Sequence, residues 1–227
     1  MNKVKSFAML DFITVKPYLG FKNIGLFALW IGIMSVITGD TMMGVGIGLM
    51  MCVMLTGYPF QIGEKNNIDA LYTTLSINKG TVVRGRYLFV LAFDVIAVVG
   101  SFIVGLAGSY TRAQFSSELF VYGDWWAFLP LAAAFLFIQA VQLALYFKFG
   151  YTKARLLGII PFLLLGAMYG VIAASGTGNL TANRILGFCM ELAENTVLFV
   201  SVITAALTAV LLISYFLSVK FYRKREL

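Results

Sequence analysis

The chain has 227 residues and a mass of 25.0 kDa, with 60% hydrophobic residues, 12% charged residues and a mean hydropathy of +0.90. Soluble domains carry roughly 45–50% apolar and about 25% charged residues, so this balance excludes a water-soluble globule, and the high hydrophobicity excludes a disordered chain. The net charge of +7 would suggest nucleic-acid binding in a soluble protein, but in a membrane protein it reflects Lys and Arg retained on the cytoplasmic side, so we expect no nucleic-acid partner.

The first predicted element is an interfacial helix within residues 1–20. Apolar residues recur at helical spacing, with the lysines and Asp11 mostly on other faces; the apolar set is Val4, Phe7, Ala8, Phe12 and Val15. Such a helix lies at the cytoplasmic surface of a bilayer, where lysines favour anionic headgroups. From this segment alone, the favoured interpretation is a simple membrane anchor that has no mechanical role.

Six apolar runs follow, and most have the ~17–25 residues that a helix needs to cross a bilayer. They cover residues 24–38, 42–60, 87–108, 125–147, 156–175 and 196–219. A single helix over 24–60 would be about 55 Å long, well beyond a hydrocarbon core of roughly 30 Å, so we expect a turn near Gly39 and Asp40.

The basic residues confirm the count of spans. Fifteen of the 17 Lys and Arg residues fall in alternate segments between these runs, and only Arg112 and Arg184 fall in the others. This is the positive-inside pattern, and it places both termini in the cytoplasm. The sequence therefore predicts an all-α integral membrane protein, with residues 1–227 forming a single transmembrane domain of six helices.

The cytoplasmic segment 61–86, between spans two and three, contains a short amphipathic helix. Its apolar residues lie at positions i, i+3, i+4 and i+7, and they are Ile68, Leu71, Tyr72 and Leu75. A polar cluster at its start suits the helix dipole, and consists of Glu64, Lys65, Asn66, Asn67 and Asp69. The helix either docks into a groove on a soluble partner or lies flat on the lipid headgroups.

The outer segment 176–195, between spans five and six, is too long and too polar to be a simple turn. It has an apolar side and also contains Arg184, Glu191 and Glu194. We expect a re-entrant or interfacial helix there.

Three polar residues lie inside predicted spans at similar depth. Asp94 is in span three, and Gln139 and Gln142 share one face of span four. A carboxylate in the membrane is costly and suggests function, so the three could line a polar translocation path. They could also hydrogen-bond to one another and only hold two helices together.

Small residues recur every four positions in three spans, which favours close helix packing. They are Gly44 and Gly48 in span two, Ser101, Gly105 and Ser109 in span three, and Gly166, Gly170 and Ala174 in span five.

The sequence carries little that could perform covalent chemistry. The chain has no histidine, which excludes Ser-His-Asp and Cys-His hydrolases and most zinc or haem sites. Its two cysteines, Cys52 and Cys189, are predicted to be unpaired, and no P-loop or other nucleotide-binding motif is present. We expect a protein that is not an enzyme and binds no cofactor or metal itself, so any ATP it uses must bind to another chain.

Residues 58–71 read YPFQIGEKNNIDAL, which resembles the PF-x-x-DEKNN-x-D signature of small class-2 ABC exporter permeases of bacteria. Residues 75–79 and 83–88, LSINK and VRGRYL, are similar to that family's LPVSRK…V…KYL, and residues 10–12 resemble its first helix. Gly63 stands where the family usually has Asp, and residues 76–79 replace Pro-Val-Ser-Arg.

The resemblance implies a permease of the bacterial cell membrane that pairs with ABC ATP-binding subunits, which hold ATP and Mg²⁺, and with a second permease, either a copy or a sibling. It also implies that the helix after Gly63 is a coupling helix received by the ATPase. Relatives are associated with export of amphipathic or antimicrobial peptides, or with self-protection against them, so the expected cargo is such a peptide or a similar hydrophobic molecule. The alternative function is a stand-alone channel or ion-coupled secondary transporter that uses Asp94.

Overall fold

A computed structural model describes residues 3–17, 19–74, 77–116, 128–157, 159–160, 163, 167 and 196–224. All the regular elements in these ranges are α-helices, as predicted. Five stretches of the described residues are long and apolar enough to cross a membrane: Phe21–Thr38, Thr41–Lys65, Lys79–Gln114, Leu129–Phe149 and Val197–Lys224. These correspond to predicted spans one to four and six. Span five, at 156–175, and the outer segment 176–195 lie largely outside the described residues.

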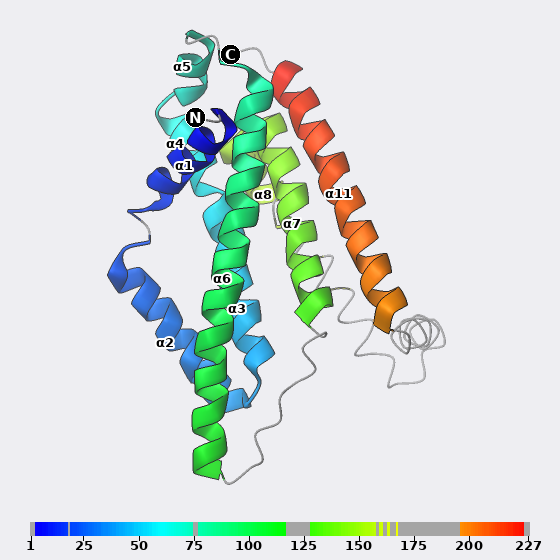
Figure 1. Cartoon of the computed structure of the whole chain (residues 1–227). Helices are drawn as coiled ribbons and strands as arrows, with labels where there is room; N and C mark the ends of the chain where they lie inside the picture. Colours follow the sequence, from blue (N-terminus) through cyan, green and yellow to red (C-terminus); the bar gives the residue numbers. More distant parts are fainter. Residues whose placement is uncertain are drawn as a thin grey trace.

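The helices form a bundle organised around one long member, α6 (Figure 1). In chain order the elements are α1 (Lys3–Val15), α2 (Phe21–Thr38), α3 (Thr41–Thr56), α4 (Tyr58–Lys65), α5 (Ile68–Thr74), α6 (Lys79–Ser116), α7 (Phe128–Phe149), α8 (Tyr151–Leu157) and α11 (Thr196–Lys224). Helix α6 contacts α1, α2, α3 and α11, while α7 packs on α3 and α11. Helices α1 and α5 and the C-terminal end of α11 lie at the same end of the bundle (Figure 1).

The turn expected between spans one and two is present. Gly39 ends α2 with a positive φ of 73°, a conformation that glycine adopts without steric cost. Asp40 then begins α3, because its Oδ1 accepts a hydrogen bond of 2.8 Å from the Met42 N–H. The prediction of two helices over 24–60 is therefore confirmed.

Helix α6 is longer than the predicted span. It covers 38 residues, about 57 Å at 1.5 Å per residue, against roughly 30 Å for a hydrocarbon core. Its first two turns lie before residue 87, in the part of the chain that the sequence analysis assigned to the cytoplasmic segment 61–86. The same helix therefore runs from the α4–α5 end of the bundle to the opposite end (Figure 1).

The small residues of α3 and α6 allow the two helices to approach closely, as predicted. A Cβ added at Gly48 would lie 2.5 Å from the Ser101 Oγ, and one added at Gly44 would lie 3.4 Å from the Gly105 Cα. The Ser109 hydroxyl, one further turn along α6, lies 3.1 Å from that of Thr41. The third small-residue stripe, in span five, is outside the described residues.

Helix α1 is present, but its predicted faces need a correction. Asp11, expected on a polar face, is buried at 5% exposure, whereas Phe12, expected on the apolar face, is 36% exposed. The buried aspartate faces Arg86 of α6, which supplies the opposite charge. Large apolar residues also cover the outer side of α1, where Met9 and Ile13 are each about 60% exposed.

Candidate functional site

The segment predicted to couple the permease to a partner consists of two helices joined by a tight turn. Helix α4 follows α3 directly after Gly57, has Pro59 in its first turn and ends at Lys65. Asn66 and Asn67 form the turn, and Asn67 has a φ of 55°, which Asn tolerates better than most residues. The short helix predicted from Ile68 is confirmed as α5. Glu64 and Lys65, predicted at the start of this helix, instead form the end of α4, which continues past Gly63 to Lys65.

Glu64 binds to another part of the same chain. Its Oε2 accepts hydrogen bonds of 2.6 Å from the Tyr151 N–H and 3.0 Å from the Thr152 N–H, at the N-terminus of α8. A carboxylate there satisfies exposed helix donors and the positive end of the helix dipole. Gly150, just before α8, has a φ of 77° and no side chain with which to cap the helix, so the acceptor comes from α4.

The apolar face of α5 is divided between the protein and the exterior. The Tyr72 ring is only 8% exposed and packs edge-on against Phe7 of α1 at 5.4 Å between centroids, and Ile68 is partly buried against the same core. Leu71, in contrast, is 55% exposed. Lys65, Asn66 and Asn67 are also exposed, while Leu75 and the side chain of Asp69 lie outside the described residues.

A buried arginine joins four helices beneath α5. The Arg86 Nε lies 3.8 Å from the Asp11 Oδ2, and its guanidinium carbon lies 4.0 Å from the centre of the Phe60 ring and 5.7 Å from that of Phe147. Arg86 of α6 therefore contacts α1, α4 and α7. Burial raises the pKa of Asp11 to about 6, and the Arg86 charge opposes that rise.

This cluster was not predicted, because Arg86 was considered only as a topology marker and as part of the family resemblance at residues 83–88. The available signal was an aspartate within an apolar helix and an arginine at the start of a span, since each requires a partner of opposite charge when buried.

A hollow of about 420 Å³ lies between α4 and α8. It is lined by Gln61, Glu64, Lys65, Tyr151, Thr152 and Arg155, which come from α4 and α8. The exposed surface at this end of the bundle therefore combines the basic side chains of Lys65 and Arg155 with the apolar side chain of Leu71.

Two of the three polar residues predicted inside the spans form a link between α6 and α7. Gln139 Nε2 donates a hydrogen bond of 2.8 Å to Asp94 Oδ1, and Gln142 is buried one turn further along α7. The other carboxylate oxygen, Oδ2, has no hydrogen-bond partner among the described residues. The structure brings Asp94 and Gln139 together as a link between helices, while the role of the three residues in translocation stays a prediction.

A second polar link fixes α11 and was not predicted. The Tyr87 hydroxyl lies 2.6 Å from the Ser214 Oγ and 2.9 Å from the Ser218 Oγ, and Ser214 donates to the Ala140 carbonyl at 2.5 Å. These bonds connect α6, α7 and α11. This link could not be predicted from the serines in the sequence, because a serine in a membrane span can satisfy its hydroxyl by donating to a carbonyl of its own helix.

Comparison with known proteins gives one family. The family model described as ABC-2 family transporter protein matches residues 8–223, which extend from the middle of α1 almost to the end of α11. No curated protein and no solved structure matches the chain.

Proposed function

Because the chain belongs to the ABC-2 family of transporter proteins, we propose that it is the membrane-spanning permease subunit of an ATP-driven exporter. A permease of this family is a transport subunit of the membrane, so ATP hydrolysis belongs to separate ABC ATP-binding subunits, which hold the ATP and Mg²⁺. The mechanistic part of the proposal is that α5 is the helix that those subunits contact.

The observation that supports this mechanism is that one side of α5 packs against the rest of the protein while the other side is exposed. Leu71 projects from α5 with more than half of its surface accessible, whereas Tyr72 is packed against Phe7 of α1. An exposed apolar side chain on a short, firmly attached helix suits insertion into a groove of a soluble partner. The other residues predicted for this contact, from Glu64 to Leu75, surround it in the sequence.

Force applied to α5 has two covalent and two non-covalent routes into the membrane domain. Helix α4 leads directly into α3, and residues 75–78 lead into α6. The Tyr72–Phe7 contact leads to α1, and the Phe60–Arg86 contact leads from α4 to α6. ATP-driven closure of the two ATPases would move α5, change the angle of α3 and α6, and alter the side to which the cavity between two permeases opens.

The location, orientation and cargo complete the proposal. We place the chain in the bacterial cell membrane with both termini in the cytoplasm, because basic residues concentrate at the end that carries α1, α5 and the end of α11. The second permease is a copy of this chain or a sibling. The proposed cargo, an amphipathic or antimicrobial peptide or similar hydrophobic molecule, follows from the resemblance to peptide exporters.

The test replaces Leu71 with Asp in the complex purified with its ATP-binding subunits. A charge in an apolar groove is costly, so Leu71→Asp should abolish the stimulation of ATP hydrolysis by the permease while membrane insertion is unchanged. The matched control is Asn78→Asp, which adds the same charge close by and keeps the acceptor that Asn78 provides to the Gly80 N–H. Full stimulation in Leu71→Asp would contradict the docking of α5.

The second candidate function is a stand-alone channel or ion-coupled transporter. It is favoured by Asp94 inside a candidate span, whose Oδ2 has no hydrogen-bond partner within the part of the chain that the structure describes. It predicts transport by the purified chain alone in liposomes, and loss of that transport in Asp94→Asn. Liposomes that remain inactive until the ATP-binding subunits are added would exclude this function and support the first.

A further inference from the structure

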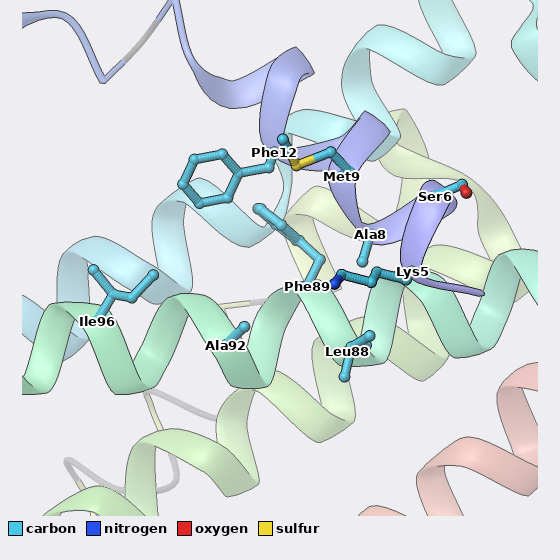
Figure 2. A pocket seen from close by; sticks show the side chains of 9 residues that line it. All are labelled: Lys5, Ser6, Ala8, Met9, Phe12, Leu88, Phe89, Ala92 and Ile96. Atoms are coloured by element: carbon cyan, nitrogen blue, oxygen red, sulfur yellow. The ribbon is translucent and has the colours of Figure 1, made fainter. Parts of the chain in front are cut away.

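Two apolar hollows follow the same side of α6 and meet at shared residues. The first, of about 530 Å³, lies between α1 and α6 (Figure 2). The second, of about 330 Å³, lies between α2, α3 and α6. Phe12 and Ile96 line both, so the two hollows adjoin and together make up an apolar groove along α6.

The groove has the length of a lipid tail and a charge at one end. Along α6 its lining extends from Leu88 to Val104, which is about 24 Å at 1.5 Å per residue. One leaflet of hydrocarbon is roughly 15 Å deep, so the groove can hold an acyl chain over its whole length. Lys5 lies at the end near Leu88 and Phe89, towards the start of α6, with its amine beside the groove (Figure 2).

We propose that this groove binds one acyl chain of an anionic phospholipid, with the headgroup phosphate held by Lys5. The wall of the groove is almost entirely apolar, as Figure 2 shows for Ala8, Phe12, Phe89 and Ala92. The combination of a long apolar groove and one terminal cation matches a lipid that has a hydrocarbon tail and a negative headgroup. Met9, which lines the groove, is 60% exposed, which suits a site that opens to the surrounding lipid.

This site differs from a general attraction of α1 to the membrane surface, because the tail would occupy a defined hollow between α1 and α6. The lipid would support the position of α1, whose Phe7 packs against Tyr72 of α5. The proposal rests on the chain being a membrane protein and not on the docking of α5, so either can fail without the other.

The experiment measures lipid retained by the full chain in nanodiscs of equal phosphatidylglycerol and phosphatidylcholine with identical tails. After transfer to mild detergent, native mass spectrometry should detect one retained phospholipid per chain. One lysine near the surface corresponds to about a fivefold preference, so phosphatidylglycerol should be retained about fivefold over phosphatidylcholine.

The variants separate the tail from the headgroup. Ala92→Trp fills the groove and should abolish retention of both lipids, while the control Ala206→Trp places the same side chain on an exposed position of α11 and should change nothing. Lys5→Gln should keep a retained lipid but lose the preference for phosphatidylglycerol. The control Lys16→Gln, which removes an exposed lysine that does not line the groove, should keep that preference.

Photo-crosslinking of the unmodified chain provides a measurement that does not depend on variants folding. A phosphatidylglycerol with a photoactivatable group in its tail should label peptides that contain residues 8–12 and 88–96. Labelling elsewhere, equal retention of the two lipids, or Ala92→Trp that retains lipid like the unmodified chain would each overturn the proposal. Loss of a dimer in Ala92→Trp, with no lipid retained by the unmodified chain, would assign the groove to a second copy instead.

Discussion

The buried pair of Asp11 and Arg86 gives a prediction whose magnitude depends on pH. At 3.8 Å and an effective dielectric constant of about 20, the two charges attract by about 4 kcal/mol. Replacement of Arg86 by Met does not lose that whole amount, because the aspartate can take up a proton. With the pKa of Asp11 at about 6, its charged form at pH 7 is favoured over the neutral form by only about 1.4 kcal/mol.

The expected quantity is the coupling energy between the two residues in a double-mutant cycle with Asp11→Asn and Arg86→Met. It should be close to zero at pH 5, about 1.4 kcal/mol at pH 7, and rise by about 1.4 kcal/mol per pH unit towards a limit of about 4 kcal/mol. The sign follows from linkage. The pKa of Asp11 is raised above its ordinary value of 3.8, so its contribution to stability is complete below pH 3.8 and is lost as the pH rises through 6. Removal of Arg86 raises this pKa further and extends the loss to higher pH.

The assay is equilibrium unfolding by sodium dodecyl sulfate in detergent micelles, followed by helical circular dichroism between pH 5 and pH 8.5. Arg84→Met is the matched control, since Arg84 is exposed and bonds to the Tyr215 hydroxyl rather than to a carboxylate. A coupling energy that is the same at pH 5 and pH 8 would refute the reasoning, because it would show that the proton of Asp11 does not respond to Arg86.

Three further predictions concern packing and hydrogen bonds, and the same unfolding assay measures them. Gly48→Ala should destabilise the protein by about 1–3 kcal/mol because its Cβ would overlap Ser101, whereas Gly100→Ala, with no atom within 4 Å of the new Cβ, should be neutral or stabilising by up to about 1 kcal/mol. Glu64→Ala should cost about 1 kcal/mol by leaving two N–H groups of α8 without their acceptor, and hydrogen exchange at those amides should accelerate. Tyr87→Phe should lower the free energy of unfolding by about 1–2 kcal/mol, because the hydroxyl that bonds to Ser214 and Ser218 of α11 is removed. An unchanged free energy of unfolding would contradict a stabilising role for these bonds.

Features that depend on local sequence were predictable. The five candidate spans of the described residues follow from apolar runs, the break between α2 and α3 follows from Gly39 and Asp40, and α5 follows from the spacing that begins at Ile68. In each of these, the residues that determine the structure lie within a few positions of one another.

Features that depend on distant partners were not predictable. Asp11 is buried because Arg86, 75 positions later, lies against it. Glu64 accepts hydrogen bonds from the start of α8 because Gly150, just before that helix, has no side chain with which to cap it. The start of α6 was placed too late for a related reason. A hydropathy boundary marks where charges begin, but a helix continues readily through arginines such as Arg84 and Arg86, which are good helix formers.

The length of α6 has a mechanical consequence. A continuous helix of about 57 Å extends past a roughly 30 Å hydrocarbon layer, so it behaves as a rigid rod whose two tips lie in different compartments. If such a rod pivots about its middle by about 10°, each tip is displaced by about 5 Å, close to the pitch of one helical turn. A small rotation started beside Lys79 would therefore reach Ser116 without any change in the internal hydrogen bonds of the rod.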